Sequence, residues 1–303
     1  MKFHVARLSF VSSAQRTLQK PEFEGNPIEL TEKLLEENPK HAPKKRGFIG
    51  LYFGDFIFDT GRKLLAARLG KFKEVKITEY DERKKVFHDR KDASFPYVYL
   101  LWDKDEQAIL VERDTSVFPN YEVLFRSIEN HLNNLLKTYE LRVSVTPLTE
   151  RMDFWRSLRE YAQGRGYLYE ANFKLYMPNF FGNTQQNLKE ILNAVKEDYN
   201  ATEFSNQISN TDGRLNIQEN DQKIDAALEW IMKGGGKWSI KGKKEEGKRK
   251  VTINSTKNAK TVETSVEIEN YTPEGVAKII SSLKPVYSIK RGLVGNDVEK
   301  GDK

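Results

Sequence analysis

The sequence predicts an α+β protein in which antiparallel sheets and packed helices form two units. Many short segments alternate apolar with polar residues, which is the period of a half-buried strand. Several of these segments are joined by short polar turns, which favours antiparallel neighbours. Fewer segments carry apolar residues at helical spacing, and the length of 303 residues suits about two domains.

The first unit is predicted over residues 1–140 as a sheet with a helix laid over it. A helix over residues 121–139 has apolar residues at helical spacing, and Asn120 is its candidate cap. We expect a hairpin that turns at Gly54 and Asp55. Together with this hairpin at residues 48–58, the expected strands are residues 2–11, 74–80, 97–102 and 107–112.

The second unit is predicted over residues 141–290, and residues 291–303 are expected to be a disordered tail. After three consecutive glycines, residues 237–241, 248–254 and 262–269 predict a C-terminal three-stranded meander, closed by a helix over residues 273–283. The other expected elements are strands at residues 141–145, 167–177 and 202–208 and helices at residues 149–163, 184–198 and 221–233.

Composition excludes several classes of protein. Without cysteine, the chain has no disulfide, thiolate zinc site or cysteine nucleophile. Apolar runs reach six residues, too few for a membrane helix, and Arg7 interrupts any signal peptide, so we expect a cytoplasmic protein without membrane insertion. The segment from Gly234 to Lys237 lacks the first glycine of a phosphate-binding loop and is followed by Trp238, so no nucleotide cofactor is predicted.

The positive charge is concentrated in one segment. The chain has a net charge of +6, and residues 233–250 alone contribute +6, because eight basic residues are offset only by Glu245 and Glu246. Spaced cations of this kind neutralise phosphates and release counterions, so they bind a nucleic-acid backbone without reading base sequence. The predicted nucleic-acid-binding residues are Lys237, Lys241, Lys243, Lys244, Lys248, Arg249 and Lys250.

Other interpretations of this region stay open. A solvated hairpin would also explain the lysines, since the glutamates of residues 262–269 could pair with them across the meander. Aromatic side chains could add base stacking. However, Tyr167, Tyr169 and Phe173 share a strand face with Ala171 that we expect to fill a core.

A metal-dependent nuclease is the first alternative function. Asp59 and Glu74 could hold Mg²⁺, and Lys76 could orient the attacking water. The Glu-x-Lys spacing is common in a chain with this many charges, and Lys76 could equally protect an exposed strand edge. The primary prediction therefore has no catalytic residue and no cofactor, and Mg²⁺ enters only with the nuclease. A protein-only scaffold that binds an acidic partner is the second alternative.

Two stretches resemble the RexA- and KwaB-like family of bacterial phage-defence DNA-binding proteins. One is residues 95–102 with the return strand at residues 108–112 and the helix after Pro119 and Asn120. The other runs from residues 145–148 through a helix to residues 173–179. The resemblance covers about residues 48–240. It implies a DNA-binding protein, expected to be a homodimer, that acts as a sensor or effector partner in anti-phage defence and phage exclusion.

Overall fold

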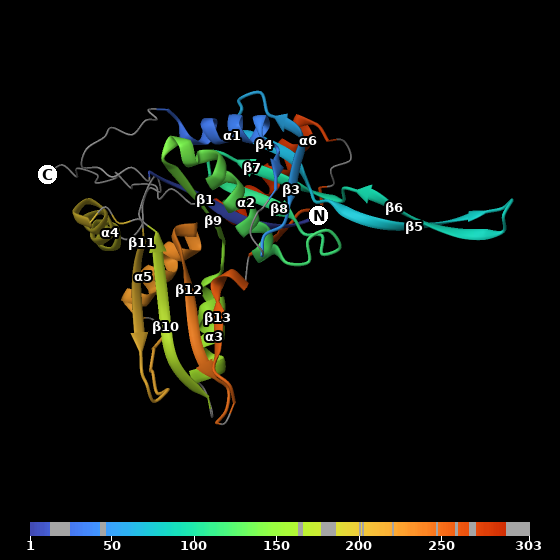
Figure 1. Cartoon of the computed structure of the whole chain (residues 1–303). Coiled ribbons are helices and arrows are strands. Elements are labelled where there is room, and N and C mark those ends of the chain that lie inside the picture. The colour runs from blue at the N-terminus through green and yellow to red at the C-terminus, as the bar shows by residue number, and fades with distance from the viewer. Residues whose placement is uncertain are drawn as a thin grey trace.

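The computed structural model confirms the α+β fold class. It describes residues 1–12, 25–42, 47–162, 166–176, 186–199, 201, 203–219, 221–246, 248–257, 260–266 and 271–288. Two antiparallel sheets form the body, and a two-stranded arm projects from it (Figure 1). No helix in the described part of the chain has both the length and the apolar character that crossing a bilayer requires.

The first sheet has the strand order β14-β1-β8-β7-β4-β3-β2, and β9 also pairs with β1. Its strands are β1 (Lys2–Ser12), β2 (Lys40–His41), β3 (Leu51–Phe58), β4 (Leu64–Gly70), β7 (Tyr97–Asp103), β8 (Ala108–Glu112), β9 (Leu141–Pro147) and β14 (Thr261–Glu263). The hairpin predicted at residues 48–58 is wrong, because β3 is one strand. Gly54 and Asp55 lie where the β3–β4 pairing shifts register, and Asp55 adopts a positive φ of 50°.

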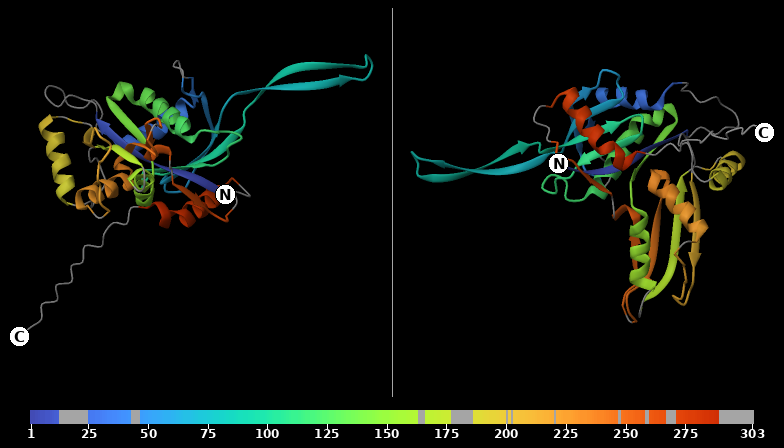
Figure 2. Two further views of the ribbon diagram at one scale, coloured as in Figure 1. Left: turned by 90° about the horizontal axis from the view of Figure 1, so that it is seen from below. Right: turned by 180° about the vertical axis from the view of Figure 1, so that it is seen from behind.

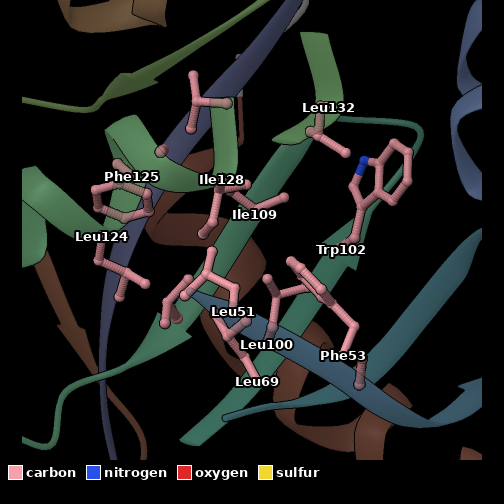
Figure 3. Close-up of a cluster of buried hydrophobic side chains, with 14 of the residues drawn as sticks. Leu51, Phe53, Leu69, Leu100, Trp102, Ile109, Leu124, Phe125, Ile128 and Leu132 are labelled. Atoms are coloured by element: carbon pink, nitrogen blue, oxygen red, sulfur yellow. The ribbon is translucent and has the colours of Figure 1, made fainter. Parts of the chain in front are cut away.

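Helices cover both faces of the first sheet. α1 (Pro27–Glu37) and α2 (Tyr121–Leu136), which continues into the short turn η1 (Lys137–Tyr139), lie on one face, and α6 (Pro273–Tyr287) lies on the other (Figure 2). Figure 3 shows the core in which side chains of α2 meet those of β7 and β8. Asn120 caps α2 as predicted, because its side-chain oxygen accepts a hydrogen bond from N of Val123 at 3.1 Å.

The arm consists of β5 (Lys73–Asp81) and β6 (Val86–Ser94), which pair only with each other among the described strands. It leaves the body between β4 and β7 and extends into solvent (Figures 1 and 2). Charged side chains pair across it: Nζ of Lys76 lies 2.5 Å from Asp89, and Nζ of Lys91 lies 2.8 Å from Glu74. These opposite-charge neighbours favour the observed register of an otherwise exposed hairpin.

The second sheet has the order β11-β10-β12-β13. Three helices pack on one of its faces, where Leu158, Leu192 and Leu228 meet Phe173 and Trp238 of the strands. The turn η2 joins α5 to β12, and η3 follows β13. The elements of this unit are α3 (Arg151–Ala162), β10 (Tyr167–Tyr176), α4 (Gln186–Tyr199), β11 (Glu203–Ser209), α5 (Gln222–Trp230), η2 (Ile231–Gly235), β12 (Gly236–Lys243), β13 (Val251–Asn254) and η3 (Ser255–Lys257).

The predicted three-stranded meander is wrong in its third strand. β12 and β13 pair as expected, but β14 pairs with β1 of the first sheet, with Val262 opposite Phe3. Both side chains are buried under α6 beside Ile279, so apolar packing draws the chain back to the first sheet. Residues 141–147, 261–263 and 273–287 thus lie with the first sheet although the sequence predicted them in the second unit. Residues 267–270 and the predicted tail at 291–303 lie outside the described residues.

Glycines fix the junction between the two units. Gly234 has a φ of +85°, and a Cβ atom there would overlap Cβ and Cγ of Arg7 on β1. A Cβ at Gly235 would overlap the indole of Trp230, and one at Gly236 would overlap the carbonyl oxygen of Lys174. The three glycines therefore allow close packing of β1, α5 and β10.

Replacing Gly234 by Ala should lower the free energy of unfolding by about 2–4 kcal/mol, since the new methyl group meets Arg7 and the backbone conformation is strained. Urea denaturation followed by tryptophan fluorescence measures this change. Gly54→Ala is the control, because nothing lies within 4 Å of its Cβ position, and it should change stability by less than about 0.5 kcal/mol. A Gly234→Ala protein as stable as the wild type would contradict the described junction.

Stability should also fall in mild acid. Burial lowers the pKa of His4 and of His131 to about 4 from 6.5. These groups stay neutral in the folded protein while the unfolded chain takes up protons, so the stability they provide is present above pH 6.5 and is lost as the pH falls towards 4. We expect a loss of about 2 kcal/mol per histidine between pH 7 and pH 5.

His131→Gln provides the test, because glutamine can still donate a hydrogen bond to the carbonyl oxygen of Asn38, which lies 3.0 Å from Nε2 of His131. Urea titrations at pH 7 and pH 5 should show a smaller loss of stability for this variant than for the wild type. The same loss in both proteins would show that His131 is not the titrating group.

Candidate nucleic-acid interface

One face of the second sheet is left uncovered by the helices of this unit. On β12, Trp238 and Ile240 are buried against the helices, and Lys237, Ser239 and Lys241 alternate with them on the other side. α3 and α5 lie in front of the sheet in the rear view of Figure 2, so Figure 1 looks onto the uncovered side. We call this side the open face; its residues on β10, β12 and β13 are Glu170, Asn172, Lys174, Tyr176, Lys237, Ser239, Lys241, Lys243, Thr252 and Asn254.

Lysines follow the open face along β12. Lys237, Lys241 and Lys243 lie on this strand, and Lys174 of β10 is opposite Lys237 in the strand pairing. Alternate residues of a strand are about 6.6 Å apart, which is comparable to the distance between successive phosphates of an extended nucleotide chain. The row therefore suits a polymer with regularly spaced negative charges.

The structure brings together part of the predicted set of basic residues. Lys248, Arg249 and Lys250 are exposed in the turn between β12 and β13, close in sequence to the lysines of the open face. Lys244 is oriented differently, since its ammonium group forms a 3.0 Å ion pair with Glu160 of α3, on the helical side of the sheet. This carboxylate raises the pKa of Lys244. Lys244 therefore does not contribute to the open face.

One of the carboxylates that could neutralise the lysines across the meander lies elsewhere in the structure. Glu263 lies on β14 in the first sheet, where its carboxylate is 2.6 Å from Nζ of Lys2. Glu267 and Glu269 lie outside the described residues. Within the described chain, the pair with Lys244 is the only ion pair that a carboxylate makes with the seven predicted residues. Lys237, Lys241 and Lys243 of the open face are thus available to an external anion, whereas Lys174 is paired with Glu203.

A bulge places two tyrosines beside the lysines. The pairing of β10 with β12 shifts register between Leu168 and Glu170, so that Leu168 and Ala171 both face the core. Nζ of Lys250 lies 3.7 Å from the ring centre of Tyr169, and Nζ of Lys243 lies 5.9 Å from that of Tyr167. The expectation that both tyrosines fill the core is therefore wrong, because the extra residue reverses the strand alternation.

The residues of the nuclease alternative do not come together. Asp59 binds the backbone of the turn before β4, accepting a hydrogen bond from N of Leu64 at 2.6 Å. Glu74 and Lys76 lie on the arm beyond the other end of β4, where both are engaged in cross-strand ion pairs. The length of β4, about 20 Å, separates them from Asp59. No group of three or more potential metal ligands occurs among the described residues.

A cleft of about 370 Å³ lies between the upper end of the open face and α2. Arg126 and Glu129 of α2 form one wall, and the other consists of Asn172 and Tyr176 of β10 with Lys237 and Ser239 of β12. The cleft exists because β9 pairs with β1 beneath α2 while the chain that follows builds the second sheet.

Burial raises the pKa values of two side chains in the cleft and leaves a third polar side chain without a described partner for its oxygen. Burial raises the pKa of Glu129, whose Oε2 accepts a hydrogen bond from N of Val145 at 2.8 Å. Burial also raises the pKa of Tyr176. Oδ1 of Asn172 is buried and has no hydrogen-bond partner among the described residues. Buried polar atoms normally have a partner, so this oxygen marks a place where a ligand donor would be favourable.

Sequence reasoning missed Asn172 and Lys174 as site residues, and it considered Tyr176 only for base stacking. Their signal was present, because they alternate with the buried Ala171, Phe173 and Leu175 along one predicted strand. What the sequence did not indicate was the pairing of this strand with β12, which places Lys174 opposite Lys237.

No protein-family model matches this chain, and no curated protein matches it at a significant level. The functional assignment therefore depends on the geometry of the open face and the cleft.

Proposed function

We propose that the protein binds nucleic acid through the open face, with its contacts directed at the phosphate backbone. The observation that carries this proposal is the row of Lys237, Lys241 and Lys243 on an uncovered strand, with no ion pair to a described carboxylate. Phosphates that meet such a row release condensed counterions, which drives association. We expect DNA as the partner, in the cytoplasm.

An acidic protein would be attracted to the same surface by charge alone. The row on β12 favours instead an extended polyanion, because its lysines lie about 13 Å and about 7 Å apart along one face of the strand, close to multiples of the phosphate repeat. Tyrosines beside the lysines also favour nucleic acid, since aromatic rings stack on bases. These observations support the nucleic-acid interpretation over the protein-only scaffold.

The triple variant Lys241→Glu, Lys243→Glu and Lys250→Glu should lose about 100-fold or more of its affinity for DNA at 0.1 M salt. The slope of log affinity against log salt concentration should fall by about 2–3, because up to three phosphate contacts disappear. Fluorescence anisotropy over a salt series measures both quantities.

The control is a triple variant on the arm, Arg83→Glu, Lys84→Glu and Lys85→Glu, which changes the net charge by the same amount far from the open face. It should retain wild-type affinity to within about threefold, since screening limits the reach of exposed charges. The proposal fails if the open-face variant binds as the wild type does, or if the arm variant loses as much affinity.

We further propose that this binding serves anti-phage defence, with the protein acting as a sensor or effector partner. The support is the resemblance of residues 48–240 to phage-defence DNA-binding proteins. A bacterial host that expresses the protein with its genomic neighbours should form fewer plaques with a panel of phages than the same host expressing the open-face triple variant. Equal plaque counts across the panel would count against a defence role.

A further inference from the structure

We infer that the nucleic acid held on the open face is single-stranded, and that the cleft beside α2 takes one unpaired nucleotide of it. This inference rests on the proposed function, because the lysine row and the cleft share Lys237. A nucleic-acid strand bound along the lysine row therefore reaches the cleft at Lys237.

The unpartnered groups of the cleft indicate the chemistry of its occupant. Oδ1 of Asn172 needs a hydrogen-bond donor, and Lys237, which forms no ion pair with a described carboxylate, places a positive charge in the lining of the same cleft. A nucleotide offers both, since bases carry N–H donors and the phosphate carries the charge. Asparagine is also a side chain that pairs with base edges in known recognition.

The other cations near the cleft are already engaged. Nη2 of Arg126 donates to the carbonyl oxygen of Gly47 at 2.9 Å, and Nζ of Lys174 lies 2.5 Å from Glu203. Lys237 makes no ion pair with a described carboxylate and feels the attraction of the more distant Glu129. A phosphate at the mouth of the cleft would therefore bind to Lys237.

The size of the cleft favours an unpaired nucleotide. A volume of about 370 Å³ is within the range of pockets that hold small organic ligands. A base in a duplex is paired and stacked, so it enters such a pocket only after being flipped out at a cost in free energy. A base of a single strand enters without that cost.

From the cleft, the bound nucleic-acid strand would continue along the open face. From Lys237 to Lys243 β12 rises about 20 Å, long enough for a few nucleotides. The row ends beside Tyr167 and Tyr169, where bases could stack. A bound strand would thus have one base enclosed in the cleft and others stacked on tyrosine rings at the far end of the row. A duplex cannot make both contacts, because its bases are already paired and stacked.

Fluorescence anisotropy with a labelled single strand of about 20 nucleotides and with the duplex of the same sequence tests the inference. At one salt concentration the wild type should bind the single strand at least about tenfold more tightly. Asn172→Leu, which keeps the side-chain size and removes the acceptor, should weaken single-strand binding about tenfold and leave duplex binding unchanged. The control Asn134→Leu makes the same change at an exposed position of α2 that does not line the cleft, and it should leave both affinities unchanged.

Photo-cross-linking of the unmodified protein provides a measurement that does not depend on how the variants fold. A single strand that carries 5-iodouracil should cross-link to Tyr176, the tyrosine of the cleft, as identified by peptide mass spectrometry. Cross-links confined to Tyr167 and Tyr169, or equal affinities for single strand and duplex that Asn172→Leu does not alter, would overturn the inference and leave backbone binding intact. Absence of binding to both probes would overturn the proposed function as well.

Discussion

The buried side chain of Arg7 on β1 holds together parts of the chain that are distant in sequence. Its guanidinium donates to the carbonyl oxygen of Tyr287 at 3.0 Å and to that of Glu106 in the turn between β7 and β8. Its aliphatic part lies against Gly234. Burial lowers the pKa of Arg7 to about 10, so it remains charged at neutral pH and requires these acceptors. α6 and the start of β12 are therefore both positioned by one strand near the N-terminus.

The second unit is an insertion between two strands of the first sheet. The chain leaves that sheet after β9, builds the second sheet and returns at β14. Because β9 lies under α2, the second sheet begins beside this helix, and the cleft follows from the topology. Residue alternation predicts that a segment is a strand but does not identify its partner, which is why residues 262–269 were predicted beside β13. In the structure, Val262 is buried with Phe3, so β14 pairs with β1 instead.

Local sequence patterns predicted the basic side of β12 but not the residues that other elements place beside it. The alternation of Lys237 and Lys241 with Trp238 and Ile240 correctly predicted which side of β12 is basic. The same rule failed for Tyr169, because one extra residue in β10 reverses the alternation and no turn residue signals it. Residues supplied by a second strand or by α2 depend on long-range pairing, so Lys174 and Glu129 could not be predicted from local sequence.

The pairing of charges distinguishes the open face from other charged parts of the molecule. On the arm, Lys76 and Lys91 are opposite each other in the strand pairing, but each forms an ion pair with a carboxylate diagonally across the strands. Lys76 pairs with Asp89, and Lys91 pairs with Glu74. Such pairs maintain register and leave little field for a ligand. On β12, neither Lys237 nor Lys241 forms an ion pair with a described carboxylate. Lys237 is opposite Lys174, which pairs with Glu203, and Lys241 is opposite Glu170. Repulsion among the lysines of β12 opposes folding slightly, and an incoming polyanion would relieve it, so the electrostatic free energy favours the binding of an anion along this strand.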